Sequence, residues 1–440
     1  MRRAGGQADE WAAVAVGAIG GLWRWRVELA LLAVPAGAWW LLANSVGELA
    51  AAALVVWMVA GVLVSPARLR ALVRLLRARH LRRRFRRAWI DAGLPPVRLG
   101  RIRAVPAGDQ ASVRVSSGCS VEDLADRREL LAASVGLREL RVLRDPGDAS
   151  RGTVTFVRRD PLVDATVAWP HARAERLSLW EPVPVGVDEL GDTVSIALPE
   201  RNVLLGGEPG AGKSAALSLL VATAALDPSC RLWLLDGKLV ELSAWAPCAE
   251  RLAGPDVGEA IALLKAVRSE MEDRYRELLA RGARKITRGD ELALHLIVCD
   301  ELAFYLAAED RKQRTEFAEL LRDLVARGRA AGMIVCAATQ KPASDVVPSA
   351  LRDLFGFRLA LRCNTPQASD TILGQGWASA GYSAATIPPG QRGVGYLLAE
   401  DGLPVRMRGF HLPDEQITRI AERASALRTD AWLAAGEASS

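Results

Sequence analysis

Cysteine is scarce in this 440-residue chain and is never closely paired along the sequence. The six cysteines are scattered, and no two of them are spaced as C-x-x-C. This distribution argues against a zinc site built from cysteines and against a disulfide framework. Scattered free thiols fit a protein that works in a reducing cytosol.

Acidic residues are nearly absent from the amino-terminal part of the chain. Before Asp91 they occur only at positions 9, 10, 28 and 48, whereas Ala67 to Arg87 contains ten arginines and no acid. Such a basic end is typical of contact with a membrane surface or with nucleic acid. The same segment carries apolar side chains at Leu69, Leu72, Val73, Leu75 and Leu76. Residues 67–96 are therefore expected to form an amphipathic juxtamembrane helix and a linker, with the arginines on anionic lipid. Direct contact with DNA is the alternative.

Charge is also missing from two apolar runs near the amino terminus. Val27 to Ala43 has one charged residue, at its edge, and Leu49 to Val64 has none. Each run is slightly shorter than the ~20 residues that cross a bilayer, but flanking residues extend both. Residues 1–66 are therefore expected to be a membrane region with two transmembrane helices, a hairpin in the lipid bilayer. A buried helical hairpin is the alternative. A signal peptide is disfavoured because there are two runs and no cleavage site before a translocated domain.

Arginine sets the expected orientation of this hairpin. Arginines at positions 2, 3, 24 and 26 precede it, and the arginine-rich segment follows it. By the positive-inside rule both ends lie in the cytoplasm and the turn Asn44–Glu48 lies outside. The shorter apolar run Trp11–Trp23 is expected to be an interfacial helix, with a third span as the alternative. The chain is thus predicted to be a multi-pass membrane protein whose remaining domains are cytoplasmic.

Residues 97–180 are expected to form a small α+β adaptor that follows the Pro95-Pro96 boundary. Strands are predicted at residues 111–115, 137–143 and 153–157. Ser120 followed by two acids predicts a helix start. The apolar stripe of that helix is expected at Leu124, Leu130, Leu131 and Val135. No catalytic constellation occurs in this segment, so its predicted role is to connect the membrane region to the domain that follows.

Glycine is concentrated where the chain carries its clearest chemical motif, Gly207 to Ser214, which reads G-x-x-x-x-G-K-S. This is the phosphate-binding loop of a nucleotide hydrolase, and it lies between an apolar strand and a helix from Lys213 to Ala225. Backbone N–H groups of the loop would cradle phosphates, Lys213 would contact the β- and γ-phosphates, and the Ser214 hydroxyl would ligate Mg²⁺. The expected ATP-binding residues are Gly207, Glu208, Pro209, Gly210, Ala211, Gly212, Lys213, Ser214 and Ala215.

Strands alternate with helices from residue 181 to 412, which predicts βαβ units and a parallel sheet. Apolar strands are expected at residues 202–206, 231–236, 294–301, 333–338 and 357–361, and a final hairpin at 394–398 and 405–410. Helices are expected at residues 257–280 and 315–331. The fold class is therefore α/β, a P-loop NTPase motor with a RecA-like parallel sheet, and residues 413–440 are expected to add one helix and a tail.

An apolar strand ending in Asp300-Glu301 is the expected partner of the phosphate loop. Asp300 would hold Mg²⁺, and Glu301 would act on the attacking water as general base. Gln340, after the next strand, is expected to sense the γ-phosphate. His295 lies inside the Asp300 strand and is expected to be a core histidine.

Four stretches of this motor resemble the FtsK/SpoIIIE family of DNA translocases. They are Gly207–Ser214, Asp236–Ser243, Asp300-Glu301 with the strand before it, and the segment from Arg329 through Gln340 to Pro342. The second stretch is the most telling, although Gly237 stands where the family usually has proline. Asp160-Pro161-Leu162 is similar to the leader of membrane-anchored, single-motor transfer proteins of conjugative elements.

The resemblance implies a homo-hexameric ring that hydrolyses ATP with Mg²⁺ and pumps double-stranded DNA at the bacterial inner membrane. Such a ring needs an arginine that reaches the neighbouring subunit's γ-phosphate. Arg358 matches the family position best, and Arg327 is the weaker candidate.

Two departures from the chromosomal members favour a transfer protein. The segment after Phe410 predicts only one helix, not a winged-helix module that reads DNA, and the membrane region is compact. The leading expectation is a translocase for conjugative or intercellular DNA transfer, with transfer proteins of the same element as partners. A secretion ATPase that moves protein is the runner-up, disfavoured by the single phosphate loop. A scaffold with an inactive ATPase is disfavoured by the intact Lys213, Ser214, Asp300 and Glu301.

Overall fold

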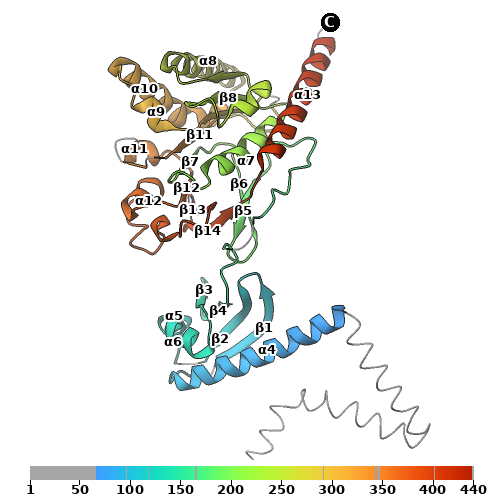
Figure 1. Cartoon of the computed structure of the whole chain (residues 1–440), viewed down its shortest axis with the longest axis vertical. Coiled ribbons are helices and arrows are strands. Elements are labelled where there is room, and N and C mark those ends of the chain that lie inside the picture. The colour runs from blue at the N-terminus through green and yellow to red at the C-terminus, as the bar shows by residue number, and fades with distance from the viewer. Residues whose placement is uncertain are drawn as a thin grey trace, which may run out of the picture. The chain divides into compact units, whose positions relative to one another are not determined.

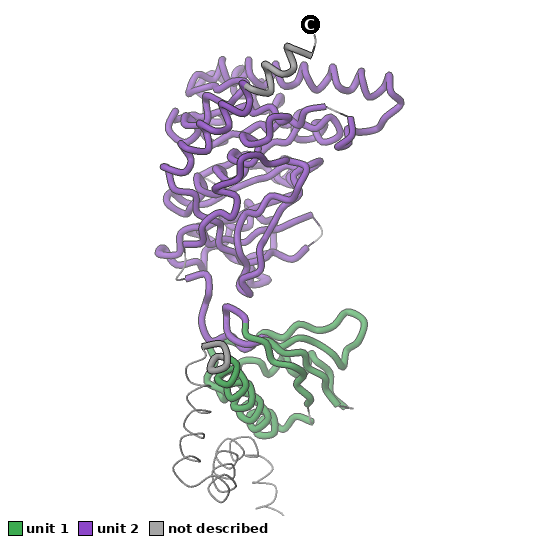
Figure 2. Tube along the Cα trace, turned by 90° about the vertical axis from the view of Figure 1, so that its right-hand side faces the viewer, with its two compact units in different colours: residues 1–104, 110–154 green, residues 105–109, 155–440 purple. Residues whose placement is uncertain are grey.

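The computed structural model describes residues 66–438 apart from positions 96, 117, 164–165, 291, 341, 344–346 and 401. The chain divides into two compact units (Figure 2). Unit 1 contains residues up to 104 and residues 110–154, and unit 2 contains residues 105–109 and 155–440. The expected transmembrane hairpin, Val27 to Val64, lies outside the described residues. Within the described ranges, no helix is both long and apolar enough to cross a membrane.

Unit 1 is a four-stranded sheet in the order β1-β2-β4-β3 with helices on one face. Its elements are α4 (Pro66–Asp91), β1 (Val97–Val105), β2 (Gly108–Val115), α5 (Val121–Asp126), α6 (Arg128–Val135), β3 (Glu139–Asp145) and β4 (Asp148–Val157). Strand β1 was not expected from the sequence. Its residues are mostly half-buried or exposed, so it has no apolar run to mark it.

The arginine-rich segment forms the expected helix, α4, and the second half of this helix packs in unit 1. Val73 and Leu75 are exposed, whereas Leu81, Phe85 and Trp89 in the second half of the helix are buried. These three follow i, i+4, i+8 spacing and so share one side of the helix. The apolar side chains that anchor α4 in unit 1 are therefore its carboxyl-terminal ones.

The helix expected after Ser120 is present as two short helices. Ser120 caps α5, with its hydroxyl accepting from the Asp123 N–H. The helix is interrupted at Arg127, and α6 begins at the next residue. Leu124 and Leu131 are buried as predicted, but Leu130 is 53% exposed. The expected apolar stripe was therefore wrong at Leu130, because the break at Arg127 changes which side of the second helix faces the sheet.

Unit 2 is a layered α/β domain built on a 10-stranded sheet (Figure 1). Its strands are β5 (Val183–Asp188), β6 (Thr193–Ile196), β7 (Val203–Gly206), β8 (Arg231–Leu235), β9 (Arg251–Ala253), β10 (His295–Cys299), β11 (Met333–Thr339), β12 (Phe357–Leu361), β13 (Val394–Ala399) and β14 (Val405–Gly409). Its α-helices are α7 (Lys213–Ala225), α8 (Val257–Arg281), α9 (Leu302–Leu306), α10 (Arg311–Arg327), α11 (Ser349–Arg352), α12 (Pro366–Leu373) and α13 (Asp414–Ala438). The 3₁₀ turns are η1 (Ser243–Cys248), η2 (Gly328–Ala331) and η3 (Ala384–Thr386).

The sheet is mixed, with strand order β6-β5-β14-β13-β12-β7-β11-β10-β8-β9. The six strands from β12 to β9 run parallel, as the alternating pattern predicted. The four strands from β6 to β13 pair antiparallel, and β13 joins β12 in antiparallel register. The hairpin expected near the carboxyl end thus extends the parallel sheet, and β5 and β6 widen it further.

The two faces of this sheet bury separate apolar cores. One core includes residues of α7 and α13, and the other includes residues of α8, α10 and α12. The expected apolar faces are buried, for example Leu264 and Met271 of α8 and Phe317 and Leu324 of α10. The helix expected at residues 315–331 begins earlier, at Arg311, and its last turn is the 3₁₀ turn η2, which ends at Gly332.

His295 is a core histidine, as expected. It is fully buried, and its Nδ1 accepts a hydrogen bond of 3.2 Å from Trp233 Nε1. Burial lowers the pKa of His295 to about 3, and the nearby Arg274 and Arg231 add to this effect. The ring is therefore neutral at physiological pH.

Candidate functional site

The phosphate loop, Gly207–Ser214, leaves the middle of the parallel sheet. Strand β7 lies between β11 and β12, and all four of its residues are buried. The loop is fixed at its start by two backbone bonds, Gly207 N–H to Thr339 O at 3.3 Å and Glu208 N–H to Arg362 O at 2.9 Å. The central position matters because the neighbouring parallel strands deliver their carboxyl ends to the same edge.

Left-handed backbone at two glycines shapes the loop. Gly210 has φ 75° and Gly212 has φ 109°, a region that other residues rarely adopt. A Cβ on Gly212 would also lie 2.9 Å from the Cα of Gly393. Helix α7 begins directly afterwards at Lys213, so the positive end of its dipole lies at the loop.

Lys213 is buried beneath the loop that it belongs to. Its Nζ donates to the carbonyl oxygens of Gly207, at 2.9 Å, and Glu208, at 3.4 Å. Burial lowers the pKa of Lys213, while the charge of Glu301 opposes that change. The ammonium group thus lies where phosphate oxygens could replace the two carbonyls as its partners.

A cavity of about 630 Å³ opens over the loop. The expected residues that line it are Pro209, Gly210, Gly212, Lys213, Ser214, Ala215 and Gln340. The remaining loop residues, Gly207, Glu208 and Ala211, do not line this cavity. Ser214 is exposed in the first turn of α7, so its hydroxyl is free to meet a ligand in the cavity.

Asp300 lies just past β10, next to the loop that follows β8. Its Oδ1 accepts a hydrogen bond of 3.1 Å from the backbone N–H of Gly237. Burial raises the pKa of Asp300 to about 7, with the neighbouring Asp236 and Glu301 adding to the rise and the Gly237 bond opposing it. Burial disfavours the negatively charged form of the Asp300 carboxylate. A cation bound beside it would compensate this charge, so the position favours cation binding.

Glu301 is held from two sides. It caps α9 by accepting from the Ala303 N–H at 3.2 Å, and the end of β11 supplies the Thr339 hydroxyl at 2.9 Å and the Gln340 N–H. Oε1 accepts from all three donors, whereas among the described residues Oε2 accepts only from the Gln340 N–H, at 2.9 Å. Oε2 therefore keeps an open lone pair that can accept from a water molecule.

The stretch Asp236–Ser243 forms a loop organised by its first residue. Asp236 is fully buried and accepts from the backbone N–H groups of Lys238, at 3.1 Å, and Leu242, at 2.7 Å. This fold carries Lys238 and Glu241 to the wall of the cavity. Asp236 is thus a structural residue that positions two charged side chains beside the phosphate loop.

Gly237 has two physical roles in this loop. Its N–H is the donor to Asp300, and a Cβ at this position would lie 2.9 Å from the Phe304 ring. A proline would lack the N–H and would meet the ring. The departure at Gly237 therefore matches the local packing and gives Asp300 a backbone partner.

Sequence reasoning missed Arg392, which lies over the phosphate loop. A Cβ on Gly210 would be 3.7 Å from Arg392 Nη2, and the next residue, Gly393, donates its N–H to Ala211 O at 2.8 Å. Arg392 is exposed, and no ion pair or hydrogen bond to it occurs within the described ranges. Glycines at 390 and 393 around an arginine were the only sequence signal, and it is weak without the fold.

The residues around the cavity fit a magnesium-bound nucleotide. The bare backbone at Gly210 and Gly212 leaves room for phosphates, and Lys213, Lys238 and Arg392 supply positive charge. Ser214 and Asp300 offer the oxygen ligands that magnesium prefers. Across the described part of the chain, no group of three or more His, Cys, Asp or Glu could hold a metal alone. A magnesium ion here would therefore need phosphate and water oxygens as further ligands.

Arg358 does not line this cavity. It is on β12, opposite Leu204 of β7, before the strand reaches the phosphate edge. Its Nη1 lies 3.5 Å from Asp353 Oδ1, and its buried Nε has no hydrogen-bond partner among the residues that the structure describes. Arg327, the weaker candidate, is engaged within the chain by Glu272, at 2.7 Å, and Asp323, at 3.1 Å.

Comparison with known proteins matches residues 174–376 to the FtsK/SpoIIIE family. The chain is 28% identical over 373 residues to the DNA translocase FtsK of Corynebacterium efficiens, covering 77% of this chain and 37% of that protein. It is 24% identical over 346 residues to the DNA translocase SftA of Bacillus subtilis, covering 74% and 35%. The chain thus spans less than half the length of these curated relatives.

Among solved structures, the fold is similar to the pCW3 conjugation coupling protein TcpA in its monomer form with ATPγS. The TM-score is 0.54 at 18% identity, and the match covers 79% of this chain and 99% of that one. The second and third ATPases of EssC from Geobacillus thermodenitrificans match with a TM-score of 0.50 at 16% identity, over 60% of this chain and 52% of that one. These likenesses establish a common P-loop fold.

Proposed function

Because residues 174–376 match the FtsK/SpoIIIE family, we propose that this chain is a membrane-anchored motor that hydrolyses ATP to translocate DNA. The observation that carries the proposal is the joining of three elements at one sheet edge: the phosphate loop, the Asp300-Glu301 pair and the Asp236–Ser243 loop. Gly237 donates a hydrogen bond to Asp300, and Thr339 donates one to Glu301 and accepts one from Gly207 of the phosphate loop.

Each residue has a definite role in this proposal. Loop N–H groups and Lys213 bind the phosphates, and Ser214 and Asp300 hold the magnesium ion, which neutralises charge on the phosphates when bound. Glu301 Oε2 accepts a proton from the attacking water, with Thr339 and Gln340 keeping the carboxylate in place. Gln340 lines the same cavity and can reach the γ-phosphate end of a bound nucleotide.

The quaternary state that we propose is a homo-hexameric ring. Arg358 supports it, because this arginine lies outside the nucleotide cavity of its own chain and its side chain is 17% exposed. In the proposed ring, the exposed part of this side chain would contact a phosphate bound to the neighbouring subunit.

The proposed substrate is double-stranded DNA moved during conjugative or intercellular transfer. The relatives named DNA translocases support DNA, and the similarity of Asp160-Pro161-Leu162 to the leader of single-motor transfer proteins supports a transfer protein. The proposed location is the bacterial inner membrane with the motor in the cytoplasm. It rests on the two apolar runs and the arginines that follow them.

The decisive test is the ATP turnover of the full chain in neutral detergent, with and without linear double-stranded DNA. We expect DNA to stimulate turnover. Lys213→Ala should lose nucleotide binding, and Glu301→Gln should bind ATP while turnover falls by about 100-fold or more. Turnover in the Lys213→Ala variant at the wild-type level would refute the site.

Two other outcomes would replace the proposal. Turnover that ignores DNA and rises with a secreted polypeptide would identify a secretion ATPase. Tight nucleotide binding with no turnover under any condition would identify a scaffold. The same ATP-turnover and nucleotide-binding assays distinguish both outcomes from DNA-stimulated hydrolysis.

A further inference from the structure

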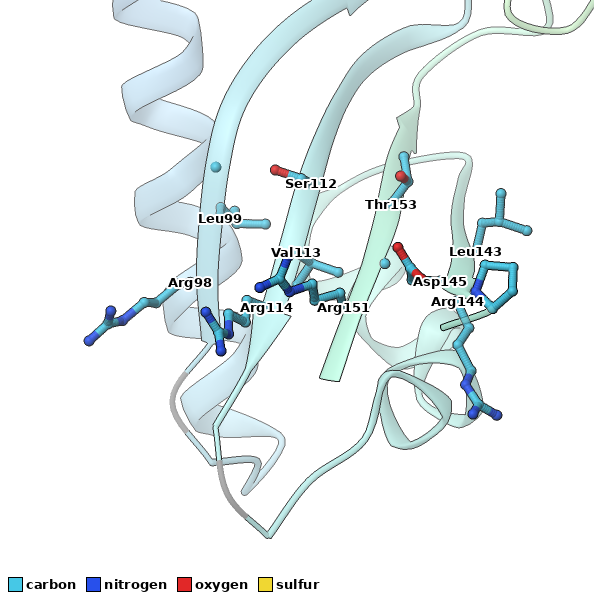
Figure 3. A pocket seen from close by; sticks show the side chains of 13 residues that line it. Arg98, Leu99, Ser112, Val113, Arg114, Leu143, Arg144, Asp145, Arg151 and Thr153 are labelled. Carbon is cyan, nitrogen blue, oxygen red and sulfur yellow. The ribbon is translucent and has the colours of Figure 1, made fainter. Parts of the chain in front are cut away.

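The open face of the unit 1 sheet is hollow and carries arginine from every strand. The hollow has a volume of about 700 Å³, and its lining includes Arg98 of β1, Arg114 of β2, Arg144 of β3 and Arg151 of β4. In Figure 3, Arg114 and Arg151 extend from neighbouring strands toward the middle of the hollow, while Arg98 and Arg144 lie on opposite sides. All four are exposed.

The opposite face of this sheet is covered by helices. On β2, Ala111, Val113 and Val115 are buried, and they alternate with the exposed Ser112 and Arg114. On β4, a Cβ at Gly152 would lie 2.9 Å from the Val121 side chain of α5. Arg151 and Thr153, the neighbours of Gly152 in the strand, therefore point away from the helices.

The floor of the hollow is made by small side chains. A Cβ on Gly100 would lie 2.2 Å from Ser112 Oγ, so these two residues share the open face. Arg98 and Arg114 are each two residues away and lie on the same side of the sheet. Thr153 completes the floor. These small residues lie between the long arginine side chains and leave a trough. The hydroxyl groups of Ser112 and Thr153 can donate hydrogen bonds to a ligand in it.

The positive charge of this hollow is only partly neutralised by the residues that the structure describes. Arg151 is paired with Asp148 at 3.0 Å, but Arg98, Arg114 and Arg144 have no ion pair within the described ranges. Asp145 is the one acid among the lining residues. The other acids of unit 1 include Glu122, Asp123, Asp126 and Glu129, which lie on or beside α5 and α6. The lining of the hollow thus holds four arginines and one acid.

We propose that this face binds the phosphate backbone of the DNA that the motor moves. Arginine and hydroxyl side chains are the usual partners of backbone phosphates. An anionic lipid surface fits less well. A membrane-docking face needs large apolar side chains beside its cations, whereas the one large, strongly exposed apolar residue in the lining is Leu143. The site rests on the proposed function for the identity of its ligand, and it gives the adaptor a DNA-guiding role separate from ATP hydrolysis.

The test measures binding of a short fluorescent DNA duplex to the full chain at several salt concentrations, with ATPγS present. The double variant Arg98→Ser/Arg114→Ser removes two unpaired charges and leaves the Arg151–Asp148 pair intact. Its matched control is Arg101→Ser/Arg128→Ser, which removes two exposed arginines of unit 1 that do not line the hollow. We expect the first variant to bind about tenfold more weakly and its salt slope to fall by about 2, with the control unchanged.

A second pair of variants adds charge to the face without removing arginine. Ser112→Glu places a carboxylate on the floor of the hollow and should also weaken DNA binding, whereas Ala133→Glu on the exposed side of α6 should not. Thermal unfolding of all four variants checks that the fold is intact.

The outcomes separate this site from the motor. If the wild-type chain binds DNA and both arginine variants match it, or both lose affinity equally, the site is refuted while the motor proposal stands. If the hollow variants keep DNA binding but lose binding to vesicles of anionic lipid, the face is a membrane site and the proposal is wrong. If the wild-type chain binds no DNA at any salt, the proposed function itself fails.

Discussion

The Thr339 hydroxyl donates a hydrogen bond of 2.9 Å to Glu301 Oε1. Both residues are buried, and they come from neighbouring parallel strands, β11 and β10, at the edge where the phosphate loop lies. The bond holds Oε1, the oxygen that also accepts from the N–H groups of Ala303 and Gln340, and so restrains the orientation of the whole carboxylate. A threonine at the end of a strand thereby positions the proposed base.

Thr339→Val tests this positioning. A hydrogen bond to a charged group contributes about 1.5–3 kcal/mol, so its loss should lower kcat by about tenfold. ATP affinity should stay within about twofold, because Thr339 does not line the nucleotide cavity. Thr339→Ser keeps the hydroxyl and should retain most of the rate. Equal losses in the valine and serine variants would contradict the hydrogen-bond role.

Arg392 is expected to bind the nucleotide in its own chain. Its guanidinium lies near Gly210 and has no protein partner within the described ranges, so a phosphate is its natural counter-ion. Arg392→Ala should weaken ATP binding by about five- to tenfold in a fluorescent-nucleotide titration, with Arg392→Lys in between. The control is Arg276→Ala, an exposed arginine of α8. Unchanged affinity in Arg392→Ala would exclude the contact.

Arg358 is expected to act on a neighbouring subunit. Arg358→Ala and Lys213→Ala should each be inactive alone. In an equal mixture, about a quarter of the interfaces in a ring would pair an intact loop with an intact arginine, so turnover should partly return. If Arg358 acts only within its own chain, every site in the mixture carries a lesion and no activity returns. Mixing Lys213→Ala with Glu301→Gln is the control, because both lesions lie in the same site.

The central part of the motor could be predicted because its strands are fully buried. Strands such as β7, β10 and β11 are continuous apolar runs, and a parallel sheet brings their carboxyl ends together. Asp300, Glu301 and Gln340 therefore meet near the phosphate loop as the order of strands and motifs implied.

The remaining parts lack such a local signal. Strand β1 is half-exposed, and β9 is only three residues long, so neither has a pattern that distinguishes it from a loop. Arg392 reaches the phosphate loop through the antiparallel hairpin β13–β14, a contact over more than 170 positions of sequence. Contacts of this kind depend on the tertiary fold, so they cannot be predicted from a short sequence motif.

Arg406 is expected to stabilise the motor by joining three separate segments. Its Nη2 lies 2.8 Å from Asp160 Oδ2 and 3.1 Å from Gln391 Oε1, and its Nη1 lies 2.7 Å from Glu189 Oε1. Arg406→Leu would remove a guanidinium partner from two largely buried carboxylates, so the free energy of unfolding should fall by about 2–4 kcal/mol. Urea unfolding of the full chain, followed by intrinsic tryptophan fluorescence, measures the change.

The same substitution should also affect the nucleotide site, because Gln391 directly precedes Arg392. Once Arg406 no longer holds Gln391, the segment over the phosphate loop loses an anchor, and ATP affinity should fall by a few-fold. Asp160→Asn/Glu189→Gln/Arg406→Leu also removes both carboxylate charges and should recover much of the stability but not the affinity. Arg276→Leu, which removes an exposed pair, should change neither quantity measurably. A stable Arg406→Leu variant with wild-type ATP affinity would show that the arginine neither supports the fold nor positions Arg392.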